Sequence, residues 1–104
     1  MPGLSDLGRF SEPALLILVS LAGGPKHGYL MIRDIEAFAG VRLGPGTLYG
    51  ALSRLERFGM VEPVPAEDRR RPYRLTSAGA GALRSELASL ERLTVAGLGR
   101  LASS

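Results

Sequence analysis

Apolar residues recur at helical spacing in four segments of this chain, and they alternate with polar residues in a short region between the third and fourth segments. The first segment predicts a helix that begins near Ser11, a good capping residue, and ends before the Gly-Gly-Pro sequence at 23–25. Residues 14–19 are apolar on every face, which is typical of a helix buried on all sides. We therefore expect part of this helix, including Leu15 and Leu16, to contact a second chain. The alternative is a central helix in the chain's own core.

Two further helices are predicted, each with an apolar stripe along one side. The second runs from residue 27 to residue 38 or 39, and the third runs from residue 45, a proline, to just before Gly59. The stripes predict these core residues: Met31, Ile32, Ile35 and Phe38 in the second helix, and Leu48, Leu52, Leu55 and Phe58 in the third.

The region after the third helix predicts a β-hairpin. Residues 60–64 and 72–76 have the composition of short strands, and residues 65–71 form a polar tip between them. Pro63 and Pro72 restrict these strands to edge positions or ends, where no backbone N–H is needed. The tip carries two acids followed by Arg69, Arg70 and Arg71. Such charge runs are usually solvated loops, but at the end of a hairpin this one favours contact with phosphate.

Thr76 is placed to cap the last predicted helix. Apolar residues on one side of this helix keep a spacing near seven, which favours packing against the same helix of a second copy. A helix lying on a membrane surface is the weaker alternative, because the polar side has no cluster of Lys or Arg. The predicted dimerisation residues are Leu83, Leu87, Leu90, Thr94, Leu98 and Leu101, together with Leu15 and Leu16 of the first helix.

Three helices, a two-stranded hairpin and a long helix, in that order, are the architecture of a winged helix-turn-helix domain. The expected fold class is mainly α with a two-stranded β wing, followed by a C-terminal dimerisation helix. We expect a flexible arm at 1–10, a DNA-binding domain at 11–76 and the dimerisation helix at 77–104.

Composition narrows the possible functions. The 104 residues, 45% of them hydrophobic, suffice for one ordinary domain. The formal charge of +3 is only mildly basic, but twelve of the thirteen basic side chains are arginine, which favours partners bound through bidentate hydrogen bonds. The absence of Cys suits a reducing cytoplasm. No apolar run reaches the roughly 20 residues that span a bilayer, so we expect a cytoplasmic protein that does not enter a membrane.

Catalysis is not expected from this sequence. A single His, no Cys and scattered acids leave no candidate general base, nucleophile or metal set, so we predict neither enzyme activity nor a cofactor nor a metal site. His27, at the start of the second helix, is interpreted as a capping or phosphate-facing group rather than a ligand.

The side of the third helix opposite its apolar stripe is small at its beginning and basic further along. Gly46, Gly50, Ser53 and Arg57 lie on it, flanked by Tyr49 and Arg54. Small residues let a helix approach a phosphate or base edge closely, and the free N–H groups at Gly46 and Thr47 attract anions. The alternative is an ordinary solvated face.

Three motifs in this order resemble the PadR family of winged-helix transcriptional regulators. They are His-Gly-Tyr at 27–29, Gly-Thr-Leu-Tyr at 46–49 and Tyr-Arg-Leu-Thr-Ser-Ala-Gly at 73–79. The resemblance covers residues 14–93 and points to the small, single-domain members. It implies a homodimeric repressor that binds an operator with twofold symmetry. In some relatives the last helices enclose an apolar pocket for aromatic or drug-like effectors, for which Leu90 and Leu93 are candidates here; the alternative role of these leucines is in the dimer seam.

The predicted mechanism places two third helices in successive major grooves, with the wings on flanking phosphates. The residues expected nearest the base edges are Gly46, Thr47, Ser53 and Arg57. The residues expected mainly on the backbone are Tyr29, Tyr49, Arg54, Arg69, Arg70 and Arg71. His27 and Tyr73 are further expected DNA-binding residues. A winged-helix module that binds protein instead of DNA, through the same surface or the leucine seam, is the alternative function.

Overall fold

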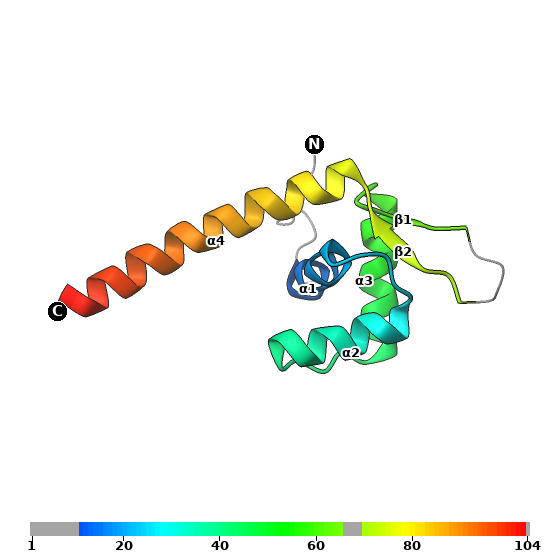
Figure 1. Ribbon diagram of the computed structural model, residues 1–104, viewed down its shortest axis with the longest axis horizontal. Helices are drawn as coiled ribbons and strands as arrows, with labels where there is room; N and C mark the ends of the chain where they lie inside the picture. The colour runs from blue at the N-terminus through cyan, green and yellow to red at the C-terminus, as the bar shows by residue number, and fades with distance from the viewer. Residues whose placement is uncertain (1–10, 66–69, 104) are drawn as a thin grey trace.

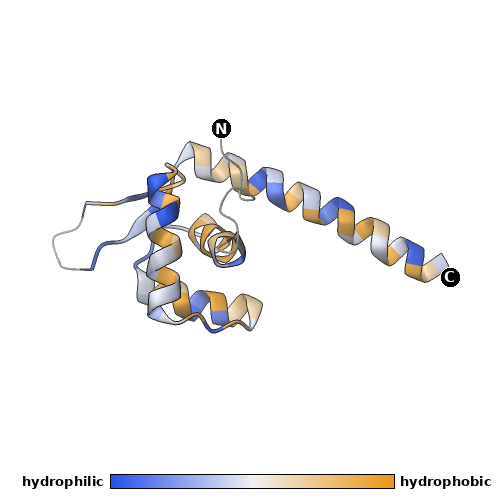
Figure 2. Cartoon of the chain, turned by 180° about the vertical axis from the view of Figure 1, so that it is seen from behind, coloured by the Kyte–Doolittle hydropathy of each residue, from blue (hydrophilic) through white to orange (hydrophobic). Residues whose placement is uncertain are grey.

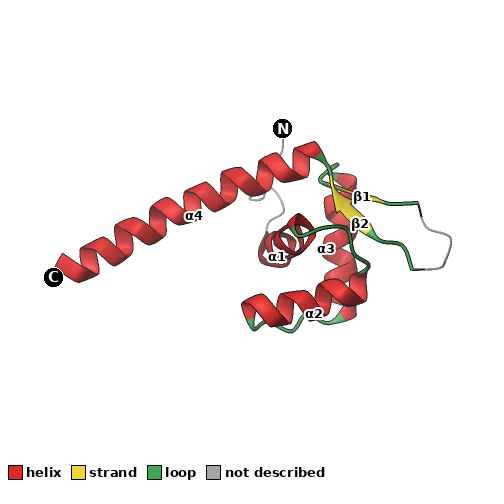
Figure 3. Cartoon of the chain, in the orientation of Figure 1, coloured by secondary structure: helices red, strands yellow, loops and turns green. Residues whose placement is uncertain are grey.

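The computed structural model describes residues 11–65 and 70–103, and within them the chain folds as four helices and one two-stranded antiparallel sheet (Figure 1, Figure 3). The elements in chain order are α1 (Ser11–Ala22), α2 (Gly28–Ala39), α3 (Pro45–Arg57), β1 (Val61–Pro63), β2 (Tyr73–Leu75) and α4 (Ser77–Ser103). The predicted mainly α fold with a two-stranded β wing is confirmed. The predicted arm at 1–10 and Arg69 at the hairpin tip lie outside the described residues.

Helix α1 lies at the centre of the domain, with α2, α3 and α4 arranged around it (Figure 1). Ala14, Ile17, Leu18 and Leu21 are buried, and the buried Ser20 hydroxyl donates a 2.7 Å hydrogen bond to Asp34 of α2. The apolar character of all faces of α1 is therefore explained largely by the chain's own core. Leu15 and Leu16 are half-buried and pack at the edge of this core.

The stripes of α2 and α3 are buried in their middle turns. Leu48, Leu52 and Leu55 are fully buried, as are Met31 and Ile35, and Ile32 is half-buried. The prediction of a core position is wrong for two residues, because Phe38 is 46% exposed and Phe58 is 37% exposed.

Both errors have the same physical reason, which is that a helical stripe is covered only as far as its neighbours extend. Phe38 lies in the last turn of α2, where the helix projects beyond α1 (Figure 1). Phe58 is the C-cap of α3, with φ −82° and ψ 1°, so the chain is already leaving the helical path. Met60, 1% exposed, enters the core in its place.

The hairpin pairs Val61 with Leu75, Glu62 with Arg74 and Pro63 with Tyr73. Each strand is one residue shorter at both ends than predicted. The N–H of Met60 bonds back to the carbonyl of Leu55 at 2.9 Å, so only the carbonyl of Met60 continues the pairing, by accepting from the N–H of Thr76 at 3.1 Å. On the other side of β2, the backbone of Tyr73 exchanges two hydrogen bonds with Lys26 of the α1–α2 loop, at 3.2 and 3.0 Å. The wing is thus fixed to the segment that begins α2.

Thr76 caps α4 as predicted, because its hydroxyl oxygen accepts a 3.0 Å hydrogen bond from the N–H of Gly79. The same hydroxyl donates to the carbonyl of Gly59 at 2.6 Å, which joins the start of α4 to the end of α3. Gly79 is buried directly against the backbone carbonyl of Met60, in a space that a Cβ atom would overlap.

After Leu83, which is 6% exposed and belongs to the core, α4 leaves the domain and extends alone, giving the molecule extents of 57 × 30 × 23 Å. The exposed part of the predicted seam therefore begins at Leu87. Hydrophobic residues continue along the helix to its end (Figure 2), and Leu98 and Leu101 are 64% and 73% exposed. No described helix is long and apolar enough to cross a membrane.

Candidate nucleic-acid interface

The outward side of α3 is exposed, and the side chains at its start are small. Gly44 precedes the helix in an extended conformation without a side-chain cap, and Pro45 takes the first helical position. An alanine methyl at Gly46 or Gly50 would meet nothing within 4 Å, and Thr47, Ser53 and Arg57 are exposed nearby. The helix can therefore approach a partner surface closely, with uncapped backbone N–H groups at its start.

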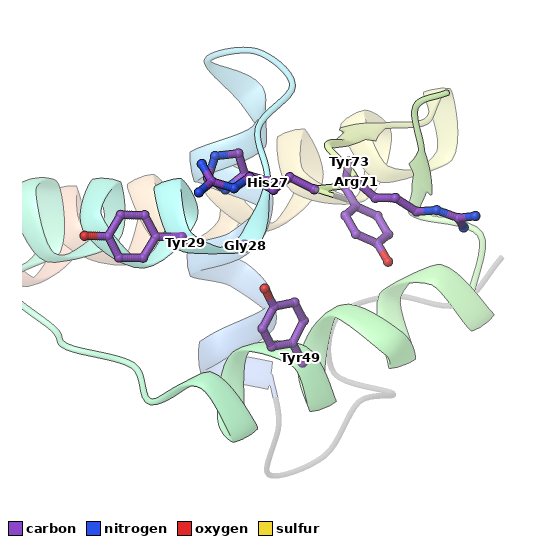
Figure 4. A pocket seen from close by; sticks show the side chains of 7 residues that line it. His27, Gly28, Tyr29, Tyr49, Arg71 and Tyr73 are labelled. Carbon is purple, nitrogen blue, oxygen red and sulfur yellow. The ribbon is translucent and has the colours of Figure 1, made fainter. Parts of the chain in front are cut away.

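Beside α3, three segments that are distant in sequence enclose a hollow of about 600 Å³. It lies between the start of α2, the first half of α3 and the returning strand of the wing (Figure 4). The lining residues are His27, Gly28, Tyr29, Tyr49, Arg70, Arg71 and Tyr73. Two guanidinium groups and three phenols make this hollow suitable for a polyanionic backbone.

The hollow explains why two of the sequence motifs occur together. Tyr49 of α3 points at Gly28 of α2 (Figure 4), and its ring occupies the space of a side chain at that position: a Cβ on Gly28 would lie 2.7 Å from Tyr49 Cζ. Gly28 thus leaves the space that the Tyr49 ring needs, a role that the His-Gly-Tyr motif did not indicate. Close packing of Gly28 and Tyr49 sets the position of a phenol that is still 50% exposed.

Tyr73 forms the wing side of the hollow. Burial raises the pKa of its phenol, the carboxylate of Glu56 raises it further, and Arg71 lowers it. At neutral pH the side chain is therefore a neutral hydroxyl that can donate a hydrogen bond to an anion.

His27 is the N-cap residue of α2, but its imidazole makes no capping hydrogen bond, so of the two predicted roles only the phosphate-facing one stays open. Its ring is stacked with that of Tyr29, with the ring centroids 6.5 Å apart and the planes at 15°. Both rings line the hollow.

The predicted site residues fall into two groups. His27, Tyr29, Tyr49, Arg70, Arg71 and Tyr73 come together in the hollow, whereas Gly46, Thr47, Ser53, Arg54 and Arg57 lie along α3 outside it. Arg69 lies outside the described residues. The arrangement therefore has a helical face and, next to it, a cationic hollow.

Lys26 has a structural role that the sequence patterns did not predict. Its ammonium donates to the backbone carbonyls of Ser20 and Gly24 and lies 3.8 Å from the Asp34 carboxylate, so it holds the end of α1 while its backbone pairs with the wing. The only feature that distinguished Lys26 in the sequence is that it is the single lysine beside twelve arginines.

An open helical face beside a basic two-stranded wing defines a winged-helix transcriptional regulator of the DNA-binding type. The model of the transcriptional regulator PadR-like family matches residues 17–85. The chain belongs to this family.

Relatives and solved structures agree with this assignment. Over 82 residues the chain is 38% identical to Transcriptional regulator Rv3488 of Mycobacterium tuberculosis, covering 76% of each protein. It is 46% identical over 86 residues to an uncharacterized 37.1 kDa protein in transposon TN4556 of Streptomyces fradiae, spanning 83% of this chain but only 25% of that protein. A PadR family transcription regulator from Clostridium difficile superposes with a TM-score of 0.77 at 21% identity, over 86% of this chain and 97% of that one.

Proposed function

We propose that the protein is a homodimeric repressor that binds an operator of twofold symmetry in the cytoplasm and is released by a small molecule or another signal. The observation that carries the DNA-binding part is the open face of α3 beside a hollow lined by Arg70 and Arg71. In this proposal α3 enters the major groove, and Gly46, Thr47, Ser53 and Arg57 face the bases. The hollow and the wing hold the backbone.

The dimer is supported by the extension of α4. Leu87, Leu90, Leu98 and Leu101 are between 37% and 73% exposed in the single chain, although they follow one side of the helix. Pairing two such helices would bury these side chains and place two α3 helices on half-sites about 34 Å apart. Leu90 and Leu93 would border any effector pocket between the paired helices.

Binding of the dimer to DNA is expected to fall steeply with salt. If the two subunits together neutralise about 6 to 10 phosphates, affinity should drop by roughly 10³ to 10⁵ between about 50 and about 200 mM salt. Fluorescence anisotropy with random and genomic upstream duplexes, on protein of established solution mass, measures this directly. Weak, salt-insensitive binding by a folded dimer would contradict the proposal and favour a protein-binding module.

Two arginine variants are expected to separate backbone contact from base reading. Arg70→Ala should weaken binding to all duplexes by a similar factor, because phosphates carry no sequence information. Arg57→Ala should change the ranking of duplexes, since a bidentate contact to a base contributes about 1–3 kcal/mol of discrimination. Binding profiles across a randomised duplex library test this, and identical profiles for both variants would refute the two roles.

A further inference from the structure

Two further cationic side chains, Arg33 of α2 and Arg42 of the loop after it, lie outside the hollow beside the wing, and Tyr29 borders both surfaces. Arg33 is exposed and stands over the ring of Tyr29, with its guanidinium carbon 5.9 Å from the ring centroid and Nη1 3.5 Å from the phenol oxygen. Within the described residues, no carboxylate lies within ion-pair distance of Arg33. The aromatic ring thus restricts the orientation of this guanidinium without neutralising its charge.

Arg42, in the α2–α3 loop, borders the same surface. Two hollows of about 500 and 410 Å³ meet there, and both are lined by Tyr29, Ile32 and Arg42. The first includes Arg33, and the second reaches Gly44 and Pro45 at the start of α3. This surface therefore adjoins the beginning of α3, whereas the wing follows directly from its end.

Arg42 is only weakly held by its own chain. Its Nε lies 3.7 Å from a carboxylate oxygen of Glu36, and the two side chains are 86% and 53% exposed. Ion pairs this exposed contribute little, so a phosphate can replace the carboxylate. The remaining polar groups on this surface are the phenol of Tyr29 and the backbone at the uncapped start of α3.

A helix in the major groove has a sugar–phosphate backbone on each side of the groove, which is about 12 Å wide. The cations of the hollow, Arg70 and Arg71, come from the wing, which follows the end of α3, whereas Arg33 and Arg42 come from the segments that lead into its start. The geometry points to a second phosphate-binding edge, formed by Tyr29, Arg33 and Arg42, that holds the backbone next to the start of α3. This inference rests on the proposed DNA-binding function, and it assigns contacts to Arg33 and Arg42 that the sequence motifs do not.

The test is the salt dependence of DNA affinity in the full chain carrying Arg33→Gln or Arg42→Gln. Each lost phosphate contact reduces the change in affinity between about 50 and about 200 mM salt by roughly 3.5-fold, or about 12-fold in a dimer that loses two contacts. The loss should be the same for all duplex sequences. Arg92→Gln is the matched control, because it removes the same charge from an exposed position on α4; its salt dependence should stay close to that of the unmodified chain.

Glu36→Gln supplies a result of opposite sign, because removing the carboxylate beside Arg42 should strengthen binding at low salt. The side chains replaced in these variants are exposed, namely those of Arg33, Glu36, Arg42 and Arg92. Unchanged circular dichroism and an unchanged melting temperature would confirm that each variant folds. If Arg33→Gln and Arg42→Gln match Arg92→Gln while Arg71→Gln still lowers the salt dependence, the second edge is overturned and the proposed function stands. If the unmodified chain binds no duplex in a salt-dependent way, the proposed function itself is wrong.

Discussion

Replacing Gly79 with alanine is expected to destabilise the fold by about 2–3 kcal/mol, the range of a strongly overpacked site. A Cβ atom at this position would overlap the carbonyl oxygen of Met60. The backbone sets the positions of both atoms, so no side-chain rotation can separate them. The start of α4 would have to shift away from the wing, which would also strain the capping hydrogen bonds of Thr76. Thermal unfolding should show a midpoint lower by roughly 10 to 20 °C.

Gly81, two residues further along the same helix, is the matched control. It is exposed, and a methyl group there meets nothing within 4 Å. Gly81→Ala should therefore stabilise the protein by up to about 1 kcal/mol through helix propensity alone. The same chemical change is thus expected to have opposite signs at the two positions. A Gly79→Ala variant as stable as the unmodified chain would show that α4 and the backbone of Met60 do not approach as closely as the structure indicates.

Replacing Leu98 with aspartate is expected to separate the dimer and to lower operator affinity by about 10²- to 10⁴-fold. Leu98 is 64% exposed in the single chain, so the substitution costs the isolated fold little. In a paired seam it would place a charge between two apolar helices. Each subunit would then bind its half-site alone, without the effective concentration that the second half-site provides. Analytical ultracentrifugation gives the mass, and anisotropy gives the affinity.

Ala96→Asp controls for the added charge. Ala96 is exposed and lies on the polar side of α4, away from the seam. This variant should remain a dimer and keep most of its operator affinity. A Leu98→Asp protein that stays dimeric would mean that the two copies associate through another surface, and the half-buried Leu15 and Leu16 of α1 would be the next residues to substitute.

Much of the fold is determined locally and could be predicted. Gly23 and Pro25, Gly40 and Pro45, and Gly59 mark helix ends in the sequence, and the structure has its helix boundaries next to them. The threonine cap of α4 is likewise a short-range signal, because donor and acceptor are three residues apart. The two phenylalanines failed for a non-local reason: whether the end of a stripe is buried depends on how far the neighbouring helices extend.

The site shows the same division. The sequence by itself determined the four helices, the wing, the motifs and the residue types of the open face of α3, because helix propensity, capping and periodicity act over a few residues. Only the tertiary structure placed Tyr49 against Gly28, joined Lys26 to Tyr73 and brought Arg33 and Arg42 to one hollow. The contacts of Tyr49 with Gly28 and of Lys26 with Tyr73 join positions 21 and 47 residues apart. Their geometry depends on how the helices pack around α1, which no local pattern encodes.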